Sequence, residues 1–124
     1  NIFVAEFIGS PKMNIIKINK EHISNSNTLH LFNNKITFDN LEFKDEIYIG
    51  IRPEHISLKN NHEIKVDVKI DLVENLGFEK IIYSKVSENQ IIIKSSENIN
   101  NNSLKISFSK DKVLFFDKDK NRIR

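Results

Sequence analysis

The stretch IKVDVKIDL, residues 64–72, alternates apolar with charged side chains at every position. A period of two places successive side chains on opposite faces of a β-strand. We therefore predict one long strand here, with its charged face in water and its apolar face in a core. The predicted core face consists of Ile64, Val66, Val68, Ile70 and Leu72.

Shorter runs on either side of this stretch predict further strands. Residues 28–32 and 35–38 flank Asn33 and Asn34, and asparagine tolerates the positive φ of a two-residue turn, so we predict a tight hairpin. A spacing of about ten residues between strands is typical of a small barrel or sandwich, and the pattern alone predicts a mostly β domain. The other strands are predicted at residues 13–18, 46–51, 80–86, 90–93, 104–108 and 113–116, with Arg122 and Ile123 as a last pairing.

The first residues of the chain have a different pattern. Residues 1–8 are rich in apolar side chains and are followed by Gly9 and Pro11, which end a helix. We predict a short N-terminal helix, with residues 1–12 as the end of a preceding domain or linker and residues 13–124 as a domain of their own. Because so short a helix needs a partner for its apolar face, we expect the chain to be the last part of a longer protein.

Composition limits what this domain can do. The formal net charge is +2, with acidic residues interleaved among the basic ones, so there is no strong field to hold a polyanion. No apolar run approaches the ~20 residues that a membrane-spanning helix needs. The absence of cysteine excludes disulfides, thiolate metal sites and a cysteine nucleophile.

Motifs for catalysis are also missing. A phosphate-binding loop of the form GxxxxGK[ST] needs glycines where the backbone approaches the phosphates, and Gly9, Gly50 and Gly77 lie outside any such pattern. The four histidines have no short ligand spacing, and nothing beside the glutamates marks a nucleophile. We therefore expect no catalytic residue, no cofactor site and no metal site in this segment.

The most distinctive polar cluster is Arg52, Pro53, Glu54 and His55. Proline removes a backbone donor and favours an extended residue before it, which is typical of the end of a strand. One interpretation makes Arg52 or His55 a contact for a regulatory ligand or a neighbouring subunit. The other, which we favour, pairs Arg52 with a carboxylate such as Glu74, because a partly buried arginine is normally held by an acid.

Four segments together resemble one protein family. They are NIFVAEFIGSPKMN at residues 1–14, IGIRPEHI at 49–56, VENLGFE at 73–79 and FFDKDKNR at 115–122. In this order they resemble the end of the ATP-binding subunits of ABC-type sugar and glycerol-phosphate importers, relatives of the maltose importer ATPase. Gly77 is expected to occupy a turn or bulge that a β-carbon would strain. The structural or regulatory candidates are Arg52, Pro53, Glu54, His55, Glu74, Gly77 and Glu79.

The resemblance implies a fold and a role. The fold would be an OB-like β-barrel of the TOBE or MOP-like kind, and the role that of a C-terminal regulatory and dimerisation domain of an importer for carbohydrate or glycerol phosphate. ATP and magnesium would bind in an upstream domain. The implied partners are a second copy, the membrane subunits of the transporter and a regulatory protein. The implied location is cytoplasmic, peripheral to the inner or cell membrane through the transporter complex.

Two other functions stay open at this point. MOP-like relatives include domains that sense small oxyanions at subunit interfaces, although no cluster of serine, threonine and lysine marks such a site in the sequence. OB-folds also bind single-stranded nucleic acid through basic and aromatic side chains. The C-terminal lysines and phenylalanines have that composition, but Asp111, Asp117 and Asp119 cancel much of the charge, so we expect no nucleic-acid partner.

Overall fold

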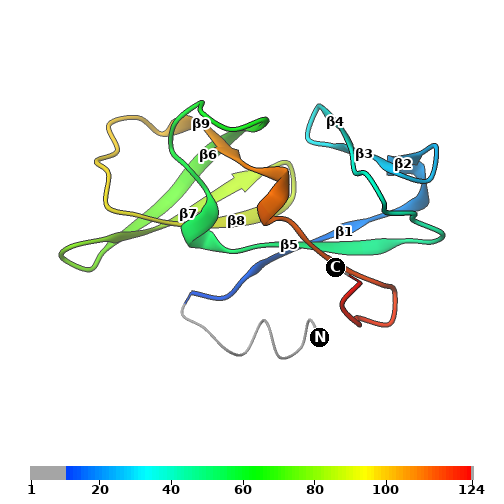
Figure 1. Ribbon diagram of the computed structural model, residues 1–124. Helices are drawn as coiled ribbons and strands as arrows, with labels where there is room; N and C mark the ends of the chain where they lie inside the picture. The colour runs from blue at the N-terminus through cyan, green and yellow to red at the C-terminus, as the bar shows by residue number, and fades with distance from the viewer. Residues whose placement is uncertain (1–10, 124) are drawn as a thin grey trace.

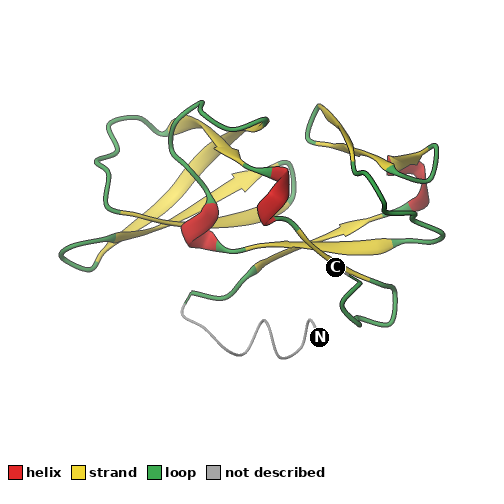
Figure 2. Ribbon diagram, in the orientation of Figure 1, coloured by secondary structure: helices red, strands yellow, loops and turns green. Residues whose placement is uncertain are grey.

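The computed structural model describes residues 11–123, which consist almost entirely of β-strands joined by loops and single helical turns (Figure 1, Figure 2). The predicted mostly β class is confirmed, whereas the predicted N-terminal helix lies outside the described residues. The strands are β1 (Asn14–Ile18), β2 (Ile23–Ser24), β3 (Thr28–Leu31), β4 (Asn34–Thr37), β5 (Ile47–Ile51), β6 (Ile64–Asn75), β7 (Lys80–Val86), β8 (Asn89–Ser95), β9 (Ser103–Phe108) and β10 (Leu114–Phe116). Three 3₁₀ turns lie between them, η1 (Lys20–His22), η2 (Pro53–His55) and η3 (Lys110–Lys112).

The strands form three antiparallel sheets. Their orders are β1-β5-β10, β2-β3-β4 and β8-β7-β6-β9. In Figure 1 the four-stranded sheet lies on the left, the small β2-β3-β4 sheet lies on the right, and β1 and β5 run between them. Within residues 11–123 the strand pairing does not close these sheets into one barrel.

All three sheets nevertheless contribute to one apolar core. Its centre holds three phenylalanine rings, with Phe38 edge-on to Phe115 at a centroid distance of 4.7 Å and Phe43 beside Phe115 at 5.4 Å. The same core contains isoleucines from the larger sheets that are essentially inaccessible to water; among them are Ile49, Ile51, Ile64, Ile82, Ile93 and Ile106. Burial of this many aliphatic and aromatic side chains is the main stabilising term for so small a domain.

Two asparagine side chains connect the sheets where strand pairing stops. Asn14 on β1 donates from Nδ2 to the carbonyl of Ile92 at 2.8 Å and accepts from the Ile92 N–H at 2.7 Å. Asn34 on β4 donates to the carbonyl of Lys65 at 2.7 Å and accepts from the Lys65 N–H at 3.3 Å. Each amide thus pairs with one residue of the four-stranded sheet as a neighbouring strand would.

The hairpin at Asn33 is present, but its turn is one residue earlier than predicted. Phe32 and Asn33 form the turn, with φ of 46° and 67°, and Asn34 belongs to β4. A left-handed backbone is unfavourable for phenylalanine. This register leaves the Asn34 side chain free to pair with Lys65, and those two hydrogen bonds offset the strain.

The long predicted strand is also confirmed, except at its end. β6 pairs with β9 from Ile64 to Lys69 and with β7 from Lys69 to Asn75. A β-bulge at Asp71 shifts the register, so that Leu72 lies opposite Tyr83. The prediction that Leu72 belongs to the core is wrong, because the bulge breaks the alternation and leaves 59% of this side chain exposed.

The remaining strands lie close to their predicted positions. β7 spans the predicted residues, and β1, β5, β8, β9 and β10 differ by one or two residues at their ends, whereas the short strand β2 was not predicted. The last pairing is present as a bridge between Phe116 and Arg122. In the described part of the chain no helix is long and apolar enough to cross a membrane.

Candidate interaction surface

The RPEH cluster forms a single helical turn after β5. Pro53 begins η2 and is buried, His55 is half-buried, and Arg52 and Glu54 are exposed. The N–H of His55 donates to the carbonyl of Arg52 at 2.9 Å, which closes the turn. Proline suits this first position because the N–H that it lacks would have no helical partner. The turn packs beside β8, where the chain passes from one large sheet to the other.

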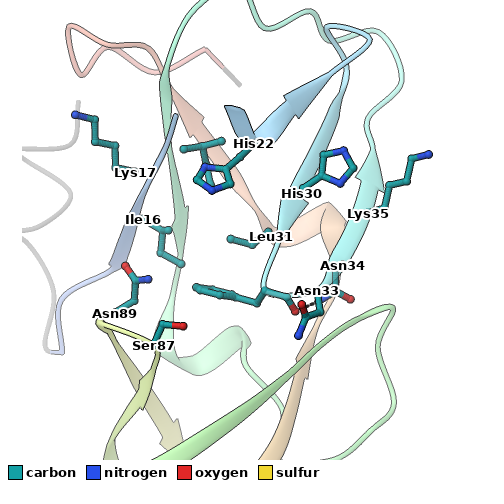
Figure 3. Close-up of a pocket in the computed structure, with 12 residues that line it drawn as sticks. Ile16, Lys17, His22, His30, Leu31, Asn33, Asn34, Lys35, Ser87 and Asn89 are labelled. Atoms are coloured by element: carbon teal, nitrogen blue, oxygen red, sulfur yellow. Dashed lines mark hydrogen bonds between the residues drawn. The ribbon is translucent and has the colours of Figure 1, made fainter. Parts of the chain in front are cut away.

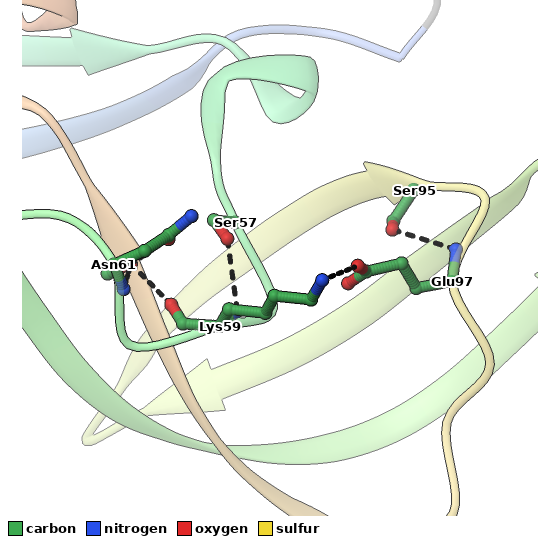
Figure 4. Close-up of polar contacts among 6 residues, drawn as sticks. Ser57, Lys59, Asn61, Ser95 and Glu97 are labelled. Carbon is green, nitrogen blue, oxygen red and sulfur yellow. Dashed lines mark hydrogen bonds and ion pairs between the residues drawn. The ribbon is translucent and has the colours of Figure 1, made fainter.

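Polar contacts fix the loop that follows this turn. Ser57 pairs with Ser107 of β9 by two backbone hydrogen bonds of 2.8 and 3.0 Å. Ser57 Oγ accepts from the Lys59 N–H at 3.0 Å, and the Lys59 ammonium forms an ion pair with Glu97 at 3.1 Å (Figure 4). The loop is therefore tied to β9 and to the segment that follows β8.

The predicted pair between Arg52 and Glu74 is not formed. Both side chains are exposed, and no ion pair within residues 11–123 includes either of them. Glu74 lies beyond the bulge at Asp71, on a part of β6 that has left the body of the domain. The prediction was wrong because it assumed that the two family motifs meet inside the core.

The other three candidates, Glu74, Gly77 and Glu79, lie together at the end of the β6–β7 hairpin. We call residues 71–79 the hairpin tip, and Figure 1 shows it projecting beyond the other strands of its sheet. Gly77 has a φ of +96°, as expected for a turn position, and its N–H donates to Asn75 Oδ1 at 3.0 Å. The N–H of Leu76 donates to the carbonyl of Glu79 at 2.9 Å.

Large apolar side chains cover the hairpin tip. Phe78 is 99% exposed, Leu72 59%, Leu76 53% and Val73 38%. Two ion pairs lie beside these apolar side chains. Glu79 pairs with Lys94 at 3.3 Å, and Asp71 pairs with Lys85 at 3.8 Å. An apolar group with a charged frame is typical of a surface that binds another protein.

A shallow cavity lies at the base of the hairpin tip. Its volume is about 270 Å³, and its lining includes Pro11, Glu74, Leu76 and Tyr83. Among the described residues no group of three or more histidines, aspartates or glutamates could hold a metal ion. The arrangement offers shape and apolar area for a protein contact.

Comparison with known proteins identifies the family. Residues 9–56 match the family described as the MalK OB fold domain. Over these residues the chain belongs to the MalK OB-fold family. The match ends at the RPEH turn, and similarity to whole proteins extends the likeness over more of the chain.

The relatives are ATP-binding proteins of ABC transporters. The maltose/maltodextrin import ATP-binding protein MalK of Aliivibrio fischeri is 36% identical over 94 residues, which are 71% of this chain and 26% of the relative. YurJ of Bacillus subtilis, an uncharacterized ABC transporter ATP-binding protein, is 30% identical over 135 residues, 94% of this chain and 36% of its own length. The sn-glycerol-3-phosphate import ATP-binding protein UgpC of Escherichia coli is 30% identical over 99 residues, 76% of this chain and 27% of its own length. This MalK OB-fold chain thus spans about a quarter to a third of the curated relatives that it matches.

The resemblance that the four segments predicted is therefore confirmed. The seven candidate residues, however, divide into two separate groups, the turn at Arg52–His55 and the hairpin tip. Sequence reasoning missed the exposed side chains Leu72, Leu76 and Phe78, and it missed the bridging amides of Asn14 and Asn34. The only signal for the asparagines was a polar residue at the start of an apolar strand.

Proposed function

We propose that this chain is the C-terminal regulatory and dimerisation domain of the ATP-binding subunit of an ABC importer. The family and the functions for which its relatives are named support the proposal. Those relatives serve the import of maltose and maltodextrin or of sn-glycerol 3-phosphate, so the solute is a carbohydrate or a glycerol phosphate. ATP and magnesium bind upstream, and this domain sits in the cytoplasm against the membrane subunits, with no catalytic residue of its own.

The observation that carries the dimerisation role is a free strand edge on the hairpin tip. β9 accompanies β6 only as far as the pair Lys69–Ser103, whereas β7 continues to Asn75. On the side that β9 leaves, the backbone of residues 71–75 makes no hydrogen bond to any other described residue. A free edge offers unpaired N–H and C=O groups to a further strand.

A second copy of the same edge fits this surface. Two antiparallel copies of residues 71–75 that cross at Val73 place Val73 opposite Val73, Leu72 opposite Glu74 and Asp71 opposite Asn75. No two carboxylates then face each other, and the pair has the two-fold symmetry of an isologous dimer. The exposed Leu76 and Phe78 beside the edge would lose contact with water in such a dimer.

The regulatory role follows from this contact. A dimer contact that differs between the open and closed arrangements of the two ATPase subunits shifts their equilibrium by its difference in free energy. The domain can then slow or speed ATP turnover without touching the nucleotide. A regulatory protein that covers the same edge would act through the same equilibrium.

Light scattering over a wide concentration range tests dimerisation of the 124-residue chain. We expect the mass to rise with concentration, although weakly, because the nucleotide-binding domains that would assist the contact are absent. Val73→Lys places two like charges at the crossing and should leave a monomer. Ile123→Lys, at an exposed apolar residue outside the hairpin tip, is the matched control and should dimerise as the unaltered chain does.

Two results would count against the proposed dimer. One is a strict monomer at millimolar concentration together with a monomeric full-length subunit in the assembled state. The other is a dimer that Val73→Lys leaves intact, which would move the contact away from the hairpin tip.

Truncation of the full-length subunit after Asn14 tests the regulatory role. Assembled with its membrane partners, the truncated subunit should keep measurable ATP turnover, with a rate or a response to solute changed by about 5- to 150-fold, the usual range of a coupling free energy. Removal of a catalytic residue would instead abolish nearly all turnover. Complete loss of turnover despite normal assembly and nucleotide binding would reject a purely regulatory domain.

A further inference from the structure

A cavity of about 570 Å³ lies between strand β1, the β3–β4 hairpin and the β7–β8 turn (Figure 3). Small-molecule sites typically measure roughly 300–1,000 Å³. No residue of the hairpin tip lines this cavity, so it is independent of the proposed dimer contact.

The floor of the cavity is apolar. Ile16 and Leu31 are each only 5% exposed and belong to the core, and Phe32 adds an aromatic side chain from the hairpin turn. Such a floor suits the C–H face of a small organic molecule, and it would not select a bare inorganic ion.

Polar side chains line the cavity from two sides. Ser87 and Asn89 lie on one side and Asn33 on the other (Figure 3). The side-chain amide of Asn34, beside Asn33, is already hydrogen-bonded to the backbone of Lys65. The side chains of Asn33, Ser87 and Asn89 make no hydrogen bond within residues 11–123, so their amide and hydroxyl groups are available to a ligand.

The charged side chains of the lining have one sign. Lys17 and Lys35 line the cavity, and none of the described residues that line it is an aspartate or glutamate. Lys17 is held at 3.6 Å by Glu46, but Lys35 forms no ion pair within the described chain. Both ammonium groups lie at the outer ends of the rim in Figure 3, on flexible stems that can turn toward an anion.

From the size, the apolar floor and the positive rim we propose that this cavity binds a small hydroxylated organic anion of the polyol phosphate class. Lys35 binds the anionic group at the rim, while Asn33, Ser87 and Asn89 bind the hydroxyl groups. The site lies within one chain and does not require the dimer.

Titration of the ¹⁵N-labelled 124-residue chain, followed by NMR, tests the site. Glycerol 3-phosphate should cause saturable shifts at Asn33, Lys35, Ser87 and Asn89. Inorganic phosphate and glycerol, titrated separately, test the anionic part and the hydroxyl part of the ligand. Each should bind more weakly than glycerol 3-phosphate. Absence of saturable shifts at these residues with glycerol 3-phosphate would overturn the proposal.

A pair of lysine variants tests the role of charge. Lys35→Gln should weaken glycerol 3-phosphate binding about fivefold, the effect of one exposed ion pair. Lys69→Gln removes another exposed lysine, outside the cavity, and should leave the affinity unchanged. Equal affinities of the two variants would remove Lys35 from the site. Light scattering reports dimerisation separately, so failure of the ligand site and failure of the proposed dimer are distinguishable.

Discussion

The two halves of β6 have similar sequences and opposite surroundings. In the inner half, residues 64–70, Ile64, Val66 and Val68 are 1%, 3% and 4% exposed. In the outer half, residues 71–75, Leu72 and Val73 are 59% and 38% exposed. The inner half pairs with β9 as far as Lys69, and the outer half pairs with β7 alone.

The difference shows that an alternating sequence specifies a strand but does not specify its burial. Burial requires a second layer over the apolar face, and the exposure of Leu72 and Val73 shows that no such layer covers the outer half within residues 11–123. Beyond this point the apolar side chains add little to the stability of the monomer. They are available to a partner instead, which is why the outer half carries the proposed dimer contact.

A lysine placed in each half should show the difference between the two halves most strongly. Val68→Lys puts a charge in the core and should cost more than about 4 kcal/mol, enough to unfold most of the chain. Val73→Lys should change the free energy of unfolding of the monomer by less than about 0.5 kcal/mol. Urea unfolding followed by circular dichroism at low protein concentration measures both, and equal losses would contradict the distinction between the halves.

Loss of an asparagine near each half should have a smaller effect. Asn34→Ala removes two hydrogen bonds to Lys65 in the inner half and should cost about 1–2 kcal/mol, since Lys65 is partly able to bond to water instead. Asn75→Ala removes one hydrogen bond to Gly77 in the exposed turn and should lower the free energy of unfolding by only roughly a few tenths of a kcal/mol. Asn34→Asp keeps the acceptor and loses the donor. An intermediate loss of stability for Asn34→Asp would support both hydrogen bonds to Lys65. A loss as small as that of Asn75→Ala would contradict the bridge.

Low pH should weaken the hydrogen bonds of Glu63, the residue that precedes the inner half of β6. The Lys110 N–H donates a hydrogen bond to the Glu63 carboxylate at 2.7 Å, and this bond is the main cause of the lowered pKa of Glu63. The backbone N–H of Glu63 and the Ser109 hydroxyl are further donors that lower this pKa. A carboxylate with a lowered pKa stabilises the fold above its ordinary pKa, and this contribution is lost as the pH falls through the folded value.

Glu63→Gln should therefore flatten the fall of unfolding free energy with acid in that window. Glu74→Gln, in the outer half, controls for the loss of one negative charge. Urea unfolding at a series of pH values measures the slope. Identical slopes for the Glu63→Gln variant and the unaltered chain would show that the capping bond to Lys110 does not matter for stability.

The smallest effect is expected between Arg52 and Glu74. A double-mutant cycle on Arg52→Ala and Glu74→Ala should give a coupling free energy within about 0.5 kcal/mol of zero, because the two exposed side chains do not meet. A coupling well above this value would show that they pair in solution.

Local patterns predicted most strands because each strand shows its own period of two. Lys80–Val86 was predicted from such a run. Leu72 was misplaced because a bulge depends on the partner strand, which local sequence does not reveal. The turn at Phe32 was misplaced for a similar reason, since the hydrogen bonds of Asn34 to Lys65 select the register over local turn preference.

The candidate residues were recognised by resemblance, and their grouping could not be predicted. The distance between Arg52 and Glu74 depends on how far β6 and β7 extend beyond the end of β9. The cavity beside Lys35 joins segments from three parts of the chain, and none of these segments contains a recognisable binding motif. Such sites are created by topology, and they become visible only when the strands are placed in space.

The bridge between Asn14 and Ile92 has a consequence for how this chain folds. The two residues are separated by 78 positions, so the bond can form only after most of the chain has been ordered. The meander of β6, β7 and β8 has short loops and can form early, whereas β1 must wait for β5 and then for β8. Attachment of β1 is thus a late step in folding. In a longer polypeptide β1 is also the first strand of this domain to leave the ribosome, and it would remain unpaired until the strands that hold it have been made.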